Sequence, residues 1–159
     1  MFEEMPKNFK PIKEVYPEWD EEDQFEFAFA WNGQDGTYGP LLKSMGFEIV
    51  VQEDEDGYQG DSVVLFAHGE YRGILIFGWG SCSGCDALKG CSSYKDIEEL
   101  REKLCNDIRW FKTSVECLEY LENHDWEGEF IFHGEDGFWN TLCAKCRKLL
   151  ANEIGGQEA

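Results

Sequence analysis

Basic residues are scarce in this chain of 159 residues. Lysine and arginine number 14 against 33 aspartates and glutamates, so the formal net charge is −19. Nucleic acid and anionic membranes repel such a chain at long range, so direct binding to DNA or RNA is not expected. The acids concentrate at the flanks: residues 1–60 hold 15 acids and four bases, whereas residues 61–110 hold eight and six. This charge favours a basic protein or cations as the partner.

Several other features are missing as well. No apolar run of 18 residues occurs, and the first residues lack the basic and apolar regions of a secretion signal. We therefore expect a cytoplasmic protein with no membrane span. Seven cysteines is an odd number, which favours free thiols or metal ligands over a disulfide framework. The sequence also contains no nucleophile elbow, zinc-protease, phosphate-loop or dinucleotide motif.

The chain does contain enough apolar material for a folded core. Hydrophobic residues make up 42% and aromatic residues 15% of the sequence, which is typical of a globular protein. We expect one globular domain over residues 18–153. An extended arm over residues 1–17, which holds Pro6 and Pro11, precedes it, and a flexible tail over residues 154–159 follows it.

The apolar patterns predict an α+β fold, with a small, mostly antiparallel sheet of three to five strands and three or four helices packed on it. Gly69-Glu70 is a tight hairpin signal, and the apolar runs on both sides of it predict two central strands. Ser93 and Thr113 are the expected N-caps of two helices. Strands are expected over residues 25–31, 47–51, 61–68, 71–79 and about 126–132. Helices are expected over residues 40–45, 94 to about 110, 115–121 and 138–152. A polar loop is expected over residues 52–60.

The strongest chemical pattern is a loop rich in glycine and cysteine over residues 78–91. Cys82, Cys85 and Cys91 stand there in a C-x2-C-x5-C spacing. Three interpretations are open: a structural zinc site, a reactive thiol at Cys82 or Cys85, or packed thiols with no special chemistry. Zinc would need a fourth ligand from Cys143, Cys146 or a histidine. Zinc is the cofactor that this pattern allows. If the thiols are only packed together, the protein needs no cofactor.

The remaining cysteines lie in apolar helical patterns. Cys143 and Cys146 share a helical face with leucines, so a place in the core is favoured over a metal-ligating role. Cys105 and Cys117 are expected in the core for the same reason. A reactive thiol would need a basic partner, and each histidine is expected at the surface or at the end of an element instead: His68, His124 and His133.

Two stretches carry a resemblance to known sequences. Residues 58–66 read YQGDSVVLF and residues 78–88 read GWGSCSGCDAL. With IRWF at residues 108–111, they resemble a group of small proteins from phage and bacterial genomes. That group has a Gly-Asp strand, a G-x-GSCSGCD loop and a following helix, and it has no established activity. The resemblance implies an intracellular, phage-related accessory protein, and no catalytic or ligand role is carried over from the group to this chain.

The favoured function is a non-enzymatic one. We expect a compact acidic protein that docks on a basic or nucleic-acid-binding host or defence protein and inhibits it, with an exposed aromatic residue as anchor. One alternative is a small cysteine-dependent or metal-dependent enzyme, and a structural zinc-binding module is another. The candidate catalytic residues of the enzyme are Asp61, Cys82, Cys85 and Asp86. The expected partner-binding residues are Asp20, Glu21, Glu22, Asp23, Glu53, Asp54, Glu55, Asp56 and Trp19.

Overall fold

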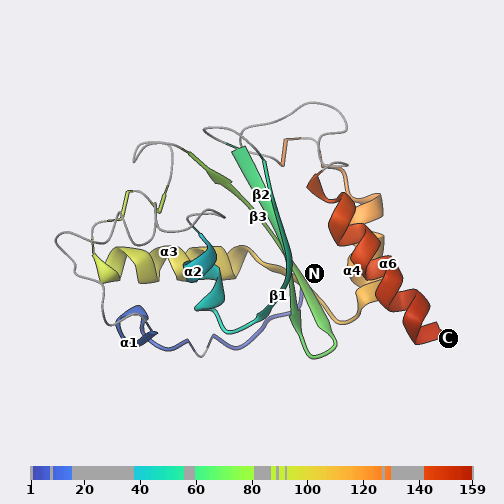
Figure 1. Ribbon diagram of the computed structural model, residues 1–159, viewed down its shortest axis with the longest axis horizontal. Coiled ribbons are helices and arrows are strands. Elements are labelled where there is room, and N and C mark those ends of the chain that lie inside the picture. The colour runs from blue at the N-terminus through green and yellow to red at the C-terminus, as the bar shows by residue number, and fades with distance from the viewer. Residues whose placement is uncertain are drawn as a thin grey trace. The chain divides into compact units, whose positions relative to one another are not determined.

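The computed structural model describes residues 2–7, 9–15, 38–55, 60–80, 87–88, 90–91, 93–126, 128–129 and 142–158. Its four strands form an antiparallel sheet, and helices accompany it, so the α+β class is confirmed (Figure 1). The elements are α1 (Ile12–Val15), α2 (Gly39–Lys43), β1 (Glu48–Asp54), β2 (Gly60–His68), β3 (Tyr71–Trp79), α3 (Tyr94–Asp107), β4 (Arg109–Phe111), α4 (Ser114–Asn123) and α6 (Ala144–Glu158).

The chain divides into two compact units, each made of segments that are distant in the sequence. Unit 1 consists of Met1–Met5, Phe47–Gly78 and Asp107–Ala159, and unit 2 consists of Pro6–Gly46 and Trp79–Asn106. The single domain expected over residues 18–153 stays a prediction. Within the described ranges, no helix has the length and apolar character that a membrane span requires.

Unit 1 is built on the sheet, whose strand order is β1-β2-β3-β4. The expected hairpin is present, because Gly69, with a φ of +60°, turns β2 into β3. Every residue of β2 from Gly60 to Ala67 is buried, as a central strand covered on both faces requires. β1 pairs with β2 from Glu48 to Asp54, so it extends three residues beyond the predicted end at Val51.

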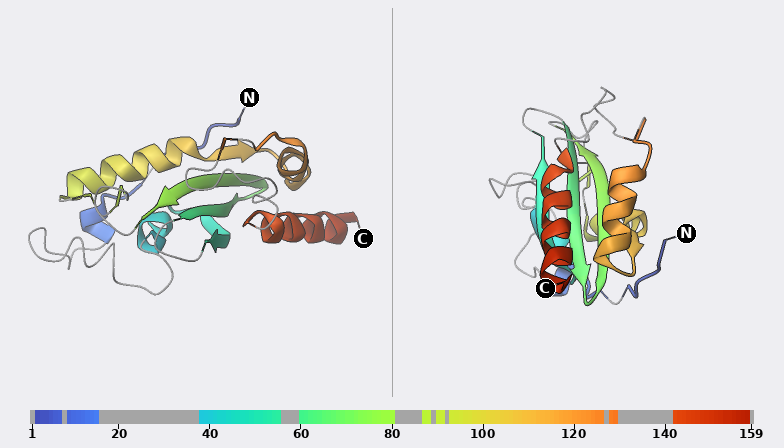
Figure 2. Two further views of the ribbon diagram at one scale, coloured as in Figure 1. Left: turned by 90° about the horizontal axis from the view of Figure 1, so that it is seen from above. Right: turned by 90° about the vertical axis from the view of Figure 1, so that its right-hand side faces the viewer.

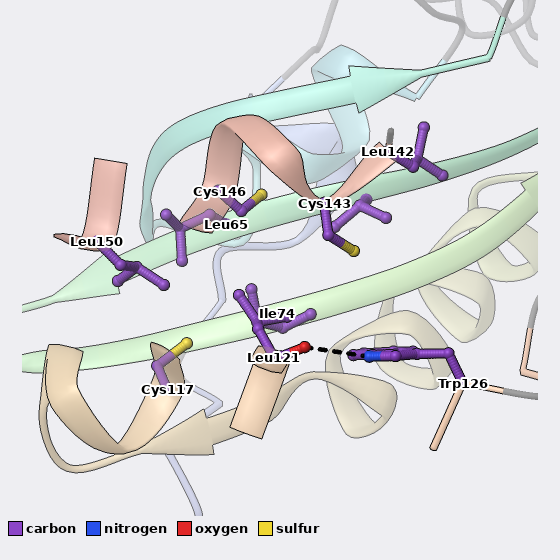
Figure 3. Close-up of a cluster of buried hydrophobic side chains, with 10 residues drawn as sticks. Leu65, Ile74, Cys117, Leu121, Trp126, Leu142, Cys143, Cys146 and Leu150 are labelled. Atoms are coloured by element: carbon purple, nitrogen blue, oxygen red, sulfur yellow. Dashed lines mark hydrogen bonds between the residues drawn. The ribbon is translucent and has the colours of Figure 1, made fainter. Parts of the chain in front are cut away.

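Helices α4 and α6 lie side by side on one face of this sheet (Figure 1; Figure 2). Strand residues that alternate along β2 and β3 point toward them, which is the pattern of a sheet with a helix-covered face. The cluster between the helices and the sheet is drawn in Figure 3, and its buried members are Val63, Leu65, Ile74, Cys117, Leu121, Trp126, Leu142, Cys143, Cys146 and Leu150.

Aromatic rings fill a second cluster of unit 1. The ring of Phe47 lies 4.8 Å from that of Trp110 and 6.1 Å from that of Phe66. Trp110 is the partner of Gly73 in the β3–β4 register, and a Cβ at Gly73 would lie 2.8 Å from atoms of both Trp110 and Ile108. Glycine at this position therefore lets the large indole pack directly on the backbone of β3.

Unit 2 contains α3 and part of the N-terminal arm. Ser93 is the N-cap of α3, as expected, because its Oγ accepts a 3.1 Å hydrogen bond from the backbone of Asp96. The arm packs along this helix: Ile12 donates from its backbone to Glu98 at 3.0 Å, and the Phe9 ring lies 4.9 Å from the Arg101 guanidinium. The Ile12 side chain is completely buried, so the arm contributes to the core as well as covering the surface.

Helices α3 and α6 end at other residues than predicted. α3 ends at Asp107, and residues 109–111 form β4 in place of the last helical turn. α6 continues to Glu158, so the expected flexible tail is helical through residues 154–158. Half-buried Ile154 extends the apolar side of α6, and adding residues to an existing helix costs little. The strand predicted over residues 25–31 lies outside the described residues, as does most of the one about 126–132.

Candidate functional site

The acidic residues at the end of β1 are the described part of the expected partner-binding set. The others, Trp19, Asp20, Glu21, Glu22, Asp23 and Asp56, lie outside the described residues. Glu53 Oε1 lies 3.6 Å from Lys145 Nζ on α6. Asp54 Oδ1 accepts hydrogen bonds from Gln52 and from the hydroxyl of Ser62. These two carboxylates therefore stabilise unit 1 internally as well as adding to its negative charge.

Glu55 closes the connection between β1 and β2. Its Oε1 accepts a 2.7 Å hydrogen bond from the backbone of Asp61, and its own backbone donates to the carbonyl of Asp61 at 3.1 Å. Asp61, a candidate catalytic residue, is completely buried at the start of β2. The polar loop predicted from residue 52 thus begins as part of a paired strand, because main-chain pairing with β2 does not require apolar side chains on an edge strand.

The negative charge is concentrated in unit 1. Its segments contain 20 acidic and six basic residues, whereas those of unit 2 contain 13 and eight. In α4 the acids Glu116, Glu119 and Glu122 are all exposed, and the helix has no lysine or arginine. Residues three apart advance by about 4.5 Å along a helix axis, so these glutamates follow one another as a row of like charges, as phosphates do along a DNA strand with a rise of about 3.4 Å. We call these three glutamates the α4 acidic row.

Most of the cysteine loop lies outside the described residues, including Cys82, Cys85 and Asp86. Cys91 is half-buried, and its Sγ donates to the carbonyl of Ala87 at 3.4 Å. Among the residues that the structure describes, no group of three histidines, cysteines or acids is arranged to hold a metal ion. The zinc and reactive-thiol interpretations of the loop therefore stay predictions.

The cysteines of α4 and α6 belong to the core. Cys117, Cys143 and Cys146 are completely buried, and the thiols of Cys117 and Cys143 point into the same apolar cluster (Figure 3). Burial raises the pKa of Cys143 and of Cys146 to about 12, and it raises the pKa of Cys117 as well. These thiols are protonated at neutral pH, whereas zinc binds thiolates, so the favoured core interpretation fits them. Cys105 is also buried and free.

Sequence reasoning missed a group of polar and aromatic side chains at the C-terminal end of α4, which we call the Arg109 cluster. Arg109 comes from β4, Tyr120 from α4, and His124, Trp126 and Glu129 from the end of α4 and the turn after it. In this turn Gly128 has a φ of +77°, and the backbone of Glu129 donates to the carbonyl of Trp126 at 3.1 Å. Arg109 is far from the others in sequence, so no local pattern marks the group.

The Glu129 carboxylate lies at the centre of the Arg109 cluster. Arg109 Nη2 donates to Oε2 at 2.7 Å, and His124 Nε2 lies 2.5 Å from Oε1. Arg109 also donates from Nη1 to the Tyr120 hydroxyl at 2.7 Å. Partial burial acts to raise the pKa of Glu129, but the hydrogen bonds from His124 and Arg109 outweigh it and hold the pKa below its usual range. Burial raises the pKa of Tyr120.

Aromatic contacts complete the Arg109 cluster. The His124 ring stacks on Tyr120 with centroids 4.5 Å apart, and Trp126 approaches both rings edge-on. The Arg109 guanidinium lies 5.8 Å from the Tyr120 centroid and 5.7 Å from that of Trp126. Trp126 is anchored in the core by a 3.2 Å hydrogen bond from its indole to the carbonyl of Leu121 (Figure 3). The cluster joins β4, α4 and the following turn, and its opposite charges are paired with one another.

Comparisons of this chain with protein-family models, curated proteins and solved structures found no match.

Proposed function

We propose that this protein is an acidic binding protein that docks on a basic, nucleic-acid-binding protein of the host cell and inhibits it. The concentration of acids in unit 1, where 20 acids accompany six bases, carries this proposal. A surface of one sign attracts a partner of the opposite sign over several ångströms and raises the rate of encounter. It also repels nucleic acid, which the same partner would otherwise bind.

The α4 acidic row supplies a concrete surface for this docking. A side chain on the exposed face of a helix can reach a partner without any rearrangement of the fold. Glu119 and Glu122 are exposed, and no cation of the described residues lies within salt-bridge distance of their carboxylates. The row offers regularly spaced charges to a site whose lysines and arginines normally contact phosphates.

Competition with DNA tests the function. A labelled duplex is bound to each of a panel of basic DNA-binding proteins, and fluorescence anisotropy follows its release as the acidic protein is added. We expect release from at least one of them, with an affinity that falls by about tenfold or more between about 50 mM and about 200 mM salt. Failure to release DNA from any of them, or release that is indifferent to salt, would refute the proposal.

A pair of charge-matched variants tests the surface. Glu119→Gln with Glu122→Gln neutralises two members of the α4 acidic row, and Glu99→Gln with Glu102→Gln neutralises two exposed acids on α3 of unit 2. The net charge changes equally in both. We expect the α4 pair to weaken binding more than the α3 pair does. Equal losses would mean that docking depends on net charge and not on α4.

A further inference from the structure

The N-terminal segment Phe2–Met5 lies against the edge strand of the sheet in unit 1. The backbone of Glu3 donates to the carbonyl of Trp110 at 3.0 Å, in an isolated antiparallel bridge to β4. Figure 2 shows this blue segment beside the orange ribbon of β4 and α4. The Phe2 ring makes edge-on contacts with Phe111 at 5.6 Å and with Tyr120 at 5.5 Å. The segment thus covers one end of a strand edge that is otherwise able to pair with a partner.

The contacts that hold this segment are weak ones. Phe2 remains 44% exposed, which makes it one of the two exposed large apolar residues of the described part of the chain. The ion pair between Glu3 and Lys112 spans 3.7 Å, and both side chains are substantially exposed to water. A backbone hydrogen bond, an exposed ion pair and two edge-on ring contacts are opposed by the entropic cost of ordering four residues. The segment can therefore be displaced by a competing group.

Displacement of Phe2 would uncover an aromatic and acidic seat, which we define as Phe111, Tyr120 and Glu116. The Phe111 and Tyr120 rings lie 5.0 Å apart and are half-buried. Glu116 is one helical turn before Tyr120, and its Oε2 accepts a hydrogen bond from the backbone of Lys112, the residue after Phe111. Two aromatic rings with a carboxylate one helical turn from one of them suit a planar cation, because the guanidinium group packs against aromatic rings and pairs with carboxylates.

We propose that this seat binds an arginine side chain of the basic partner and that Phe2 occupies the seat in the free protein. This inference rests on the proposed function and identifies one contact through which the protein would hold its basic partner. Tyr120 already packs against one guanidinium, that of Arg109, whose charge is paired with Glu129. The adjacent α4 acidic row provides the charge complementarity that selects a basic partner over an uncharged one. The Lys112 ammonium opposes the arginine, but its 63% exposure lets water screen it.

The direction in which Phe2→Ala changes the affinity for a basic peptide separates this proposal from binding through net charge alone. Phe2→Ala removes the competing occupant, so binding of an oligo-arginine peptide should become about 3- to 10-fold tighter. Phe111→Leu removes a ring of the seat and should weaken binding about 3- to 10-fold. Val115→Ala is the matched control: it trims the other exposed large apolar residue and should change nothing. An oligo-lysine peptide of equal length should gain less from Phe2→Ala, since an ammonium cannot stack.

Isothermal titration calorimetry measures these affinities, and NMR shifts of the Phe111 and Tyr120 ring protons locate the peptide. Unchanged melting temperatures establish that the variants are folded. Salt-sensitive binding that Phe2→Ala leaves unchanged or weakens would overturn the seat while the proposed function stands. Absence of binding by either peptide, together with failure of the DNA-release experiment, would overturn both.

Discussion

Arg109 donates from Nη2 to Oε2 of Glu129 at 2.7 Å, and the two side chains are only 22% and 27% exposed. This contact joins β4 to the turn after α4, and the other carboxylate oxygen bonds to His124. Exposed ion pairs contribute little to stability, whereas charged hydrogen bonds that are largely shielded from water contribute more. The Arg109 cluster should therefore contribute measurably to the stability of unit 1.

Glu129→Gln should lower the free energy of unfolding by about 1–3 kcal/mol, because the amide keeps the size of the side chain but loses the charge. Urea denaturation followed by circular dichroism gives this value. Glu99→Gln is the control, since the contact of Glu99 with Lys95 spans 3.7 Å between exposed side chains. Its cost should be below about 0.5 kcal/mol. Equal costs would show that the Arg109 cluster contributes no more than a surface pair.

The same carboxylate should make unit 1 sensitive to acid. The pKa of Glu129 is lowered in the folded protein, so its contribution is complete above the unfolded value of about 4.3. The contribution is lost as the pH falls through the lower, folded pKa. Melting temperatures measured from about pH 6 to about pH 3 should therefore fall less steeply in Glu129→Gln than in the native chain. Parallel curves for the two proteins would contradict the assignment.

The buried thiols predict a loss of stability at alkaline pH. The pKa of Cys143 and Cys146 is about 12 in the folded protein, against about 8.5 for an exposed thiol. Stability is thus complete below about pH 8.5 and declines as the pH rises toward 12, by up to about 1.4 kcal/mol per pH unit for each thiol. Cys143→Ala with Cys146→Ala should flatten this decline. A thiol reagent should label both residues in urea and neither in the folded protein.

The N-cap of α4 predicts a small, specific effect. Thr113 Oγ1 accepts a 3.2 Å hydrogen bond from the backbone of Glu116. Thr113→Ala should cost about 1 kcal/mol in the free energy of unfolding, and Thr113→Ser, which keeps the hydroxyl, should cost much less. Chemical denaturation of the two variants side by side measures the difference. If serine and alanine are equally destabilising, the hydroxyl does not cap the helix.

Two glycines should respond to alanine with opposite signs. At Gly73 a Cβ would lie 2.8 Å from both Ile108 and Trp110, so Gly73→Ala should destabilise by about 1–3 kcal/mol. At Gly155 in α6 nothing lies within 4 Å of the added Cβ, so Gly155→Ala should stabilise by about 0.5–1 kcal/mol. Thermal unfolding monitored by circular dichroism compares the two. A neutral Gly73→Ala would mean that Trp110 does not pack on β3.

The features that could be predicted from the sequence are those with local signals. Gly69 marks the central hairpin, and Ser93 and Thr113 mark the caps of α3 and α4, because turns and caps depend on residues within a few positions of one another. The helix predicted over residues 40–45 is also present as α2 (Gly39–Lys43), with Pro40 in its first turn and the left-handed Gly46, with a φ of +82°, three residues beyond its end. The core positions of Cys117 and Cys143 followed from helical periodicity in the same way.

The features that were missed depend on distant residues. The apolar spacing of α3 continues through Trp110, so the sequence predicts a helix at the residues that form β4. The strand depends on pairing with β3 and on the space that Gly73, which has no side chain, leaves for Trp110. Arg109 reaches Glu129, 20 residues later, only because β4 and α4 pack together. The sequence predicts a loop at Glu53 and Asp54, because polar side chains in an edge strand give no sign that the main chain is paired. None of these contacts between distant residues produces a periodic pattern in the sequence.

The interleaving of the two units has a consequence for how the chain is made on the ribosome. All of unit 2 has been synthesised by residue 106, whereas unit 1 needs residues 107–159 as well. The hairpin of β2 and β3 is translated before the residues that cover Val63, Leu65 and Ile74, which are Cys117, Leu121, Cys146 and Leu150. The nascent chain must therefore hold an uncovered apolar sheet face until residues 117–150 have been synthesised, and during that interval chaperones would be most needed.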